Sequence, residues 1–321
     1  MSPLLEVSDL VKHFPISGGL FGRSREAVRA VDGLSFHVDP GETLSIVGES
    51  GCGKSTVGKV VLRLTDATSG DIRFDGRSYG AAGATEMKAI RRRLQVVFQD
   101  PFSSMNPRMR VRDIIAEPLR NFGLADNRAE TTDKVRGLLV RVGLSAEALN
   151  RYPHEFSGGQ RQRLCIARAL APGADLIICD EAVSALDVSV KAQIVNLLSD
   201  LQQEIGVALL FISHDLAIVE HLTHRVAVMY LGKIVETADR RELFTDARHP
   251  YTRALLSAVP APKLNARKDR VVLKGDVPNP IHPPAGCRFH TRCPYAFDRC
   301  RVEEPVLRAV ASGHLSACHL D

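Results

Sequence analysis

Glycine, lysine and hydroxyl side chains stand at fixed spacing in residues 43–56, which read TLSIVGESGCGKST. The segment fits the pattern G-x-x-x-x-G-K-[ST], with Gly48, Gly53, Lys54 and Ser55 at its fixed positions. Glycines let backbone N–H groups surround phosphate oxygens, because no side chain blocks the approach. Lys54 would reach the β- and γ-phosphates, and the Ser55 hydroxyl would ligate Mg²⁺. A chance glycine turn is the alternative, but the apolar run before the loop and the helical spacing after it favour a nucleoside triphosphate site.

Further polar side chains follow apolar runs that are predicted to be buried strands. ADLIICDE ends in Asp180, which is suited to holding magnesium, and in Glu181, which would polarise a water molecule. Gln99 ends another run, at the place where ligands bind in open α/β sheets. His214 ends a third run and would contact a γ-phosphate. Each signal has a structural alternative when taken singly: acidic residues are common at strand ends, a glutamine often caps a loop, and a lone histidine is usually structural.

Two further features indicate ligand contact. Phe14 closes the first predicted strand and would stack on a purine base, or it is simply an edge-strand core residue. The segment FSGGQRQR places Ser157 as the N-cap of a helix whose first two glycines leave backbone N–H groups bare. This is a second predicted anion site, for which a plain N-cap is the alternative.

The elements that must position these residues follow from apolar periodicity and turn chemistry. Strands are predicted at Leu4–Phe14, Val28–Val38, Asp71–Phe74, Leu94–Phe98, Ala174–Glu181 and Val207–Ser213, with a hairpin-like pair at Arg225–Glu236 around Leu231-Gly232. A basic, glycine-rich loop is predicted at Pro15–Ala27, and residues 111–149 have a charged helical pattern that indicates an inserted helical subdomain.

The composition of the 321 residues is ordinary for a globular protein, with 45% hydrophobic and 25% charged residues and a net charge of +5. Neither a signal peptide nor an apolar run long enough to span a bilayer is recognised, so the chain is predicted to be intracellular. Seven cysteines in a reducing compartment argue against a disulfide framework. Cys52, Cys165 and Cys179 are interpreted as small buried or loop residues.

The order of these motifs resembles that of the ATP-binding cassette (ABC) ATPases over residues 4–260. The resemblance implies an α/β P-loop NTPase fold, with a RecA-like core, an antiparallel β subdomain and a helical subdomain at about residues 100–165. Two positions depart from the family pattern, Phe156 for leucine and Ala182 for proline, and neither removes a functional group. A competent hydrolytic site is therefore expected.

The resemblance also implies roles for individual residues. The ATP-binding residues would be Phe14, Gly48, Glu49, Ser50, Gly51, Gly53, Lys54, Ser55, Thr56 and Gln99. Lys54, Glu181 and His214 would act in catalysis, Glu181 as the general base and His214 as the γ-phosphate sensor. The magnesium ligands would be Ser55, Gln99 and Asp180. Ser157, Gly158, Gly159 and Gln160 would contact the nucleotide of a partner subunit, and Asp187 would line the dimer interface.

Five segments narrow the resemblance to the ATPase subunits of oligopeptide and dipeptide importers, most closely the second of the two paralogous subunits. They are VGESGCGKST, VFQDPFSSMNPRM, RYPHEFSGGQRQR, ALDVSVKAQIVNLL and HPYTRALLSAVP. The family implies a heterodimer with the paralogous ATPase, two permease subunits, an external solute-binding protein, and a place on the cytoplasmic face of the membrane. Relatives also move nickel, glutathione and peptide-like antibiotics.

The last part of the chain, residues 261–321, is predicted to be a separate extension after a cassette domain of residues 1–260. Its four cysteines, Cys287, Cys293, Cys300 and Cys318, are separated by 5, 6 and 17 residues. Four cysteines in a cytosolic tail indicate a metal, although this spacing alone does not select which one. The importer family implies a 4Fe–4S cluster; zinc and free thiols are the alternatives.

The sequence disfavours two other classes of function. A soluble cassette ATPase acting on nucleic acid or ribosomes would generally carry two cassettes or long coiled-coil inserts, which this chain lacks, and its net charge of +5 is too small to indicate nucleic acid. An iron–sulfur sensor with a secondary ATPase is disfavoured by the complete motif set. The expected ligands are therefore ATP, Mg²⁺ and an iron–sulfur cluster, with no nucleic acid.

Overall fold

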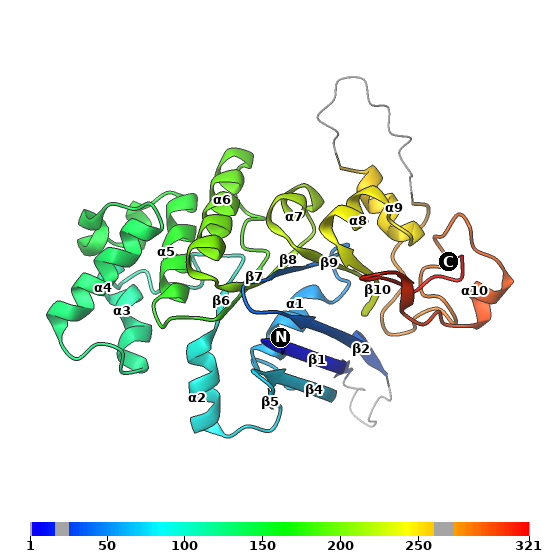
Figure 1. The fold of residues 1–321 in the computed structure, drawn as a ribbon, viewed down its shortest axis with the longest axis horizontal. Helices are drawn as coiled ribbons and strands as arrows, with labels where there is room; N and C mark the ends of the chain where they lie inside the picture. Colours follow the sequence, from blue (N-terminus) through cyan, green and yellow to red (C-terminus); the bar gives the residue numbers. More distant parts are fainter. Residues whose placement is uncertain (1, 17–25, 260–272, 321) are drawn as a thin grey trace. The chain divides into compact units, whose positions relative to one another are not determined.

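The computed structural model describes residues 2–16, 26–259 and 273–320 and contains two compact units (Figure 1). The first unit comprises the described residues up to Leu4 together with Val38–Thr43 and Phe74–Ile212. The second comprises Leu5–His37, Leu44–Arg73 and the described residues from Ser213 onward. Most of the predicted basic loop and the predicted domain boundary after residue 260 lie outside the described residues.

Three parallel strands form the sheet of the first unit. They are β6 (Leu94–Val97), β7 (Leu176–Asp180) and β8 (Ala208–Ser213). The central strand β7 pairs on both sides, with Val97 opposite Cys179 and Asp180 opposite Ile212. Their sequences are almost continuous apolar runs, as expected for parallel strands that are buried on both faces.

Helices make up most of the rest of the first unit. They are α2 (Ala84–Arg93), α3 (Val111–Asn121), α4 (Arg128–Arg141), α5 (Gly158–Leu170) and α6 (Val188–Ile205), with short 3₁₀ turns at Ala146–Asn150 and Pro153–Glu155 and the two-residue strand β5 (Arg77–Ser78). Helices α3, α4 and α5 pack against one another (Figure 1). The stretch predicted to be a helical insertion thus contains α3 and α4.

The second unit holds the strand that leads into the phosphate-loop motif. That strand, β3 (Thr43–Val47), runs parallel to β9 (Arg225–Tyr230), which forms an antiparallel hairpin with β10 (Lys233–Asp239). Leu231 and Gly232 join the hairpin with positive φ values of 44° and 83°, the sign that a tight two-residue turn requires. A second sheet has the order β2 (Ala27–Val38), β1 (Leu5–Pro15), β4 (Ser69–Phe74).

The helices of the second unit are shorter. They are α1 (Lys54–Val61), α7 (Leu216–Leu222), α8 (Arg240–Thr245), α9 (Pro250–Ser257) and α10 (Asp298–Val302). Helix α1 begins directly at the lysine of the phosphate-loop motif, and its buried face includes Val57, Val60 and Val61. The positive end of its backbone dipole therefore points toward the loop.

The C-terminal extension joins the sheet of the second unit. Its strand β12 (His314–Ser316) pairs antiparallel with β10, and β11 (Arg308–Ala311) pairs with β12. His314 Nε2 lies 2.7 Å from Glu236 Oε1, and both side chains are buried. Glu236 also accepts the backbone N–H groups of Arg248 and His249, so this buried carboxylate joins β10 to both the extension and the start of α9. The described part of the extension is thus built into the same sheet as β9 and β10.

Candidate functional site

The phosphate-loop motif forms a tight turn between β3 and α1. Gly48 and Gly53 adopt φ values of 157° and 108°. A Cβ at Gly48 would lie 2.1 Å from the Met229 carbonyl oxygen, and one at Gly53 would lie 1.9 Å from that of Ala30. Both glycines are therefore required by the close approach of neighbouring backbone.

The ammonium group of Lys54 lies over this loop. The side chain is buried, and Nζ donates hydrogen bonds to the carbonyl oxygens of Gly48 at 2.8 Å and of Glu49 at 2.9 Å. The lysine is thus held at the centre of the loop, where a cation would meet phosphate oxygens. Ser55 and Thr56 follow in the first turn of α1, where hydroxyl groups lie at the positive end of the helix.

Phe14 lies in β1 and is 40% exposed, so the residue is accessible for stacking on a base. Lys12 Nζ lies 4.8 Å from the ring centroid. Phe14 is therefore not a residue of the buried core. Its contact with adenine remains a prediction.

The residues of the first unit that were predicted to bind magnesium and to act as general base lie at the ends of adjacent strands. Because Val97 lies opposite Cys179 in parallel register, Gln99 and Asp180 lie at the same end of β6 and β7. Mg²⁺ prefers oxygen ligands, and the side chains of Gln99 and Asp180 both offer one. The third predicted ligand, Ser55 of the second unit, offers a hydroxyl oxygen. The chemistry of this donor set therefore fits magnesium.

Glu181 has an unusual backbone conformation for a residue with a side chain, with φ at 48°. Its N–H donates to the Ile212 carbonyl at 3.0 Å, and its own carbonyl accepts bonds from the N–H and the hydroxyl of Ser184, both at 3.0 Å. Ala182 is buried within this turn. Surrounding hydrogen bonds thus hold the turn in place without the proline that is usual in the family, and a strained backbone of this kind is typical of functional sites.

His214, the predicted γ-phosphate sensor, follows β8 and is exposed. It belongs to the second unit with Lys54, whereas Gln99, Asp180 and Glu181 belong to the first. The role of each of these residues stays a prediction.

The SGGQ segment starts α5, as predicted. Ser157 Oγ accepts the Gln160 N–H at 3.3 Å, while the Ser157 N–H donates to Gln160 Oε1 at 3.0 Å. These two bonds form a capping box, and they leave Gly158 at the exposed start of the helix.

Asp187 is the exposed N-cap position of α6. The unusual Phe156 is buried and lies under the Arg151 guanidinium, 4.6 Å from its carbon.

Comparisons with known proteins agree with this geometry. Residues 31–184 match the ABC transporter family model, and residues 235–300 match that of the oligopeptide/dipeptide transporter C-terminal region. The chain is 55% identical over 317 residues to a probable peptide ABC transporter ATP-binding protein of Sinorhizobium fredii, covering 99% of this chain and 90% of that protein. It belongs to the ATP-binding subunits of oligopeptide and dipeptide ABC transporters.

Two further likenesses are consistent with this family. The oligopeptide transport ATP-binding protein AppF of Bacillus subtilis is 51% identical over 320 residues, covering 99% of this chain and 97% of that protein. A dimeric post-hydrolysis structure of the ATP-binding cassette MJ0796, bound to ADP and Pi, aligns with a TM-score of 0.65 at 25% identity. That alignment covers 74% of this chain and 99% of the other. The predicted cassette fold is thereby confirmed.

In this ABC transporter subunit the matched C-terminal region contributes contacts to the phosphate loop that sequence reasoning missed. The Glu49 N–H donates to the Tyr251 hydroxyl at 2.8 Å, and Arg292 donates to the Glu49 carboxylate through two nitrogens. The carboxylate raises the pKa of Arg292. The family segment HPYTRALLSAVP contains Tyr251, but nothing in its local pattern indicates a loop some 200 residues earlier.

A neighbouring residue of that segment gives the subunit a pH-dependent stability. His249 is 1% exposed, and its Nδ1 accepts the Tyr251 N–H at 3.1 Å. Burial, with a contribution from Arg253, lowers the pKa of His249 from 6.5 to about 3. Because the unfolded chain binds this proton first, the His249 contribution to stability is complete above about pH 6.5 and is lost as the pH falls toward 3.

We therefore expect His249→Asn, whose amide oxygen can replace the N-cap acceptor, to remove this component of acid sensitivity. Relative to wild type, the variant should gain about 1.4 kcal/mol per pH unit as the pH falls below 6, measured by urea unfolding between pH 7 and pH 5. His221→Asn, on the exposed face of α7, is the matched control and should follow the wild-type profile. Parallel profiles for His249→Asn and wild type would contradict the assignment.

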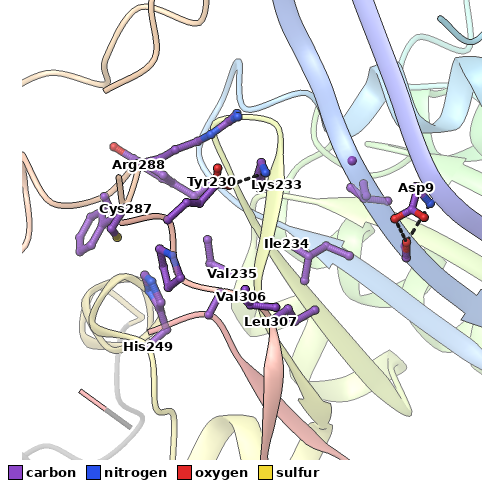
Figure 2. Close-up of a pocket in the computed structure, with 17 residues that line it drawn as sticks. Asp9, Tyr230, Lys233, Ile234, Val235, His249, Cys287, Arg288, Val306 and Leu307 are labelled. Carbon is purple, nitrogen blue, oxygen red and sulfur yellow. Dashed lines mark hydrogen bonds and ion pairs between the residues drawn. The ribbon is translucent and has the colours of Figure 1, made fainter. Parts of the chain in front are cut away.

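A cavity of about 520 Å³ lies where the extension packs against β10 (Figure 2). Strand residues Ile234 and Val235 and extension residues Val306 and Leu307 are among those that line it. Its charged side chains are engaged with other residues: Lys233 pairs with Glu304, Arg288 with Asp32, and Asp9 accepts a bond from Ser35 at 3.3 Å. The first ion pair joins the extension to β10, and the second joins it to β2.

Among the described residues, none of the four cysteines of the extension forms a disulfide; Cys300 and Cys318 are buried and the other two are half-buried. Burial, together with the nearby thiols, raises the pKa of Cys287 to about 11. Among residues 2–16, 26–259 and 273–320, no group of three or more His, Cys, Asp or Glu side chains is arranged to hold a metal ion. The predicted metal-binding character of the extension is therefore not supported. Cys52, Cys165 and Cys179 are free and buried, as predicted.

Within the described part of the chain, every helix is too short or too polar to cross a membrane.

Proposed function

We propose that this chain binds and hydrolyses ATP and thereby powers the import of di- and oligopeptides, as one subunit of an ABC transporter. The single observation that carries this proposal is the phosphate loop, in which neighbouring backbone demands two glycines and Lys54 is held at the centre. The relationship to peptide and oligopeptide transport ATP-binding proteins along 99% of the chain supports the substrate class.

The residues of the site divide the chemistry among themselves. Backbone N–H groups of the loop and Lys54 bind the phosphates, and Phe14 stacks on the adenine. Glu181 accepts a proton from the attacking water, whose oxygen bonds to the γ-phosphorus as the bond to the β-phosphate oxygen breaks. His214 contacts the γ-phosphate. When bound by Ser55, Gln99 and Asp180, Mg²⁺ supplies positive charge against the phosphate oxygens.

We propose that the active form is a dimer, and the signature segment supports this. The exposed start of α5, Ser157–Gln160, contacts the nucleotide held by a paralogous ATPase subunit, and Asp187 lines their interface. Its position at a helix N-terminus suits an anion such as the γ-phosphate. The helical subdomain then receives the two permease subunits at the cytoplasmic face of the membrane, and an external solute-binding protein delivers the peptide.

The substrate class is tested by the ATPase activity of the complex, reconstituted from this subunit, its paralogue, the permeases and the binding protein. We expect a binding protein loaded with di- or oligopeptides to stimulate hydrolysis severalfold, compared with the empty binding protein or one offered nickel. Stimulation by nickel, glutathione or a peptide-like antibiotic, and not by peptides, would keep the ATPase function and reject the peptide assignment.

A 4Fe–4S cluster at Cys287, Cys293, Cys300 and Cys318, with zinc as the alternative, is a separate prediction that the arrangement of the described residues does not support. Iron, sulfide and zinc analysis of the full chain purified without oxygen tests it. Absence of all three would leave free thiols.

A further inference from the structure

An arginine of the C-terminal extension forms an ion pair with the phosphate loop of the same chain. Arg292 Nη1 donates to Glu49 Oε2 at 2.6 Å, and Nη2 donates to Oε1 at 3.0 Å. The Arg292 side chain is only 7% exposed and that of Glu49 28% exposed, so solvent screens the pair weakly. Two parallel bonds of this kind fix the orientation of both groups as well as their distance.

The backbone of Glu49 is held as firmly as its side chain. Its carbonyl accepts a bond from Lys54 Nζ at 2.9 Å, and its N–H donates to the Tyr251 hydroxyl at 2.8 Å. The Arg292 guanidinium carbon lies 5.9 Å from the ring centroid of Tyr230, which is also buried. Three regions of the second unit, α1, α9 and the extension, thus converge on one residue of the loop.

The charge of Glu49 is the reason that this contact matters for nucleotide binding. Glu49 directly follows Gly48 in a loop whose proposed ligand is a triphosphate, so its carboxylate would repel the phosphate oxygens. A guanidinium in bidentate contact neutralises that charge and turns the carboxylate oxygens toward the extension. Arg292 keeps this charge at any physiological pH, since an arginine is not deprotonated in proteins.

We propose that Arg292 is a positioning residue for ATP binding: it neutralises Glu49 and holds the phosphate loop in its binding shape, so that the C-terminal extension sets the affinity of the site for ATP. This inference rests on the proposed role of the phosphate loop as the ATP site.

The test is the affinity of the full chain for AMP-PNP with Mg²⁺, measured by calorimetry. Arg292→Ala should raise Kd about tenfold, equivalent to about 1.4 kcal/mol. Arg292→Gln, which keeps length and a hydrogen-bond donor but no charge, should weaken binding in the same direction. Arg299→Ala is the matched control, since Arg299 forms an exposed ion pair with Glu303 in the same extension at 2.7 Å, and Kd should not change.

The double variant Glu49→Gln/Arg292→Ala separates charge neutralisation from a general loss of structure. Removing the carboxylate should return Kd to within about threefold of wild type, a recovery that a merely structural role of Arg292 would not produce. Failure of the double variant to recover, or wild-type affinity in folded Arg292→Gln, would overturn the proposal. Lys54→Ala tests the underlying site independently: if it binds AMP-PNP like wild type, the proposed function fails.

Discussion

Replacing Glu181 by glutamine should abolish nearly all ATP turnover while leaving ATP binding intact. An amide has the size and shape of the carboxylate but cannot accept the proton of the attacking water, and loss of a general base costs about 10²–10⁴-fold in rate. The turn that carries residue 181 is held by backbone bonds to Ile212 and Ser184, which the substitution leaves in place. Steady-state hydrolysis by the assembled complex measures the loss, and AMP-PNP calorimetry of the full chain measures the retained binding.

The same variant should accumulate as an ATP-bound closed dimer, detected by size-exclusion chromatography with ATP present. Glu204→Gln is the control, because Glu204 is an exposed glutamate within helix α6 and does not lie at the end of a strand. It should hydrolyse ATP at the wild-type rate. Hydrolysis at that rate by Glu181→Gln, once the site of the paralogous subunit is accounted for, would reject Glu181 as the base.

Replacing Gly53 by alanine should disable the phosphate loop through backbone collision. The added Cβ would lie 1.9 Å from the Ala30 carbonyl oxygen and 2.9 Å from Met229 Cε, at a φ of 108° that side chains disfavour. Overpacking and backbone strain each cost about 1–3 kcal/mol, and the fixed strand β2 leaves little room for relaxation. We expect a loss of at least about 2 kcal/mol of stability, and a displaced loop should weaken nucleotide binding by about 10²-fold or more.

Gly51→Ala provides a control within the same loop. Gly51 also has a positive φ, 80°, but no heavy atom lies within 4 Å of the position that its Cβ would take. Only conformational strain should remain, about 1–2 kcal/mol by urea unfolding. Equal losses of stability in the two variants would show that close approach does not explain the glycine at position 53.

Much of the fold was predictable because the decisive signals are local. Apolar runs bounded by turn residues indicated β6, β7 and β8, and Leu231-Gly232 indicated the hairpin of β9 and β10, as the structure shows. Ser157 was recognisable as an N-cap because the capping bond spans only three residues. These signals depend only on residues close together in the sequence. They can therefore be recognised without knowing how the chain folds.

The C-terminal extension was predicted less well. The four cysteines indicated a metal-binding extension, but the described residues contain no group of side chains arranged to hold a metal ion. The structure shows that strand β12 of the extension pairs with β10. The number and spacing of cysteines show which side chains could bind a metal, but they do not show whether the fold brings those side chains together. The short segment HLS at β12 has too little alternation to indicate a strand, and its pairing with β10 is what stabilises it.

By itself, the sequence determined that this protein has a phosphate loop, a strand-end carboxylate pair and a capped signature helix, because each depends on residue types at short, fixed spacing. Only the tertiary structure decided that Arg292 faces Glu49, 243 residues earlier, and that Tyr251 holds the same residue. Such contacts form because the burial of apolar surface packs together segments that are far apart in the sequence. This driving force is non-directional, so local sequence patterns do not show which distant segments will meet. The residues of the candidate site can therefore be predicted from local spacing, whereas the contacts that hold the phosphate loop are seen only in the folded molecule.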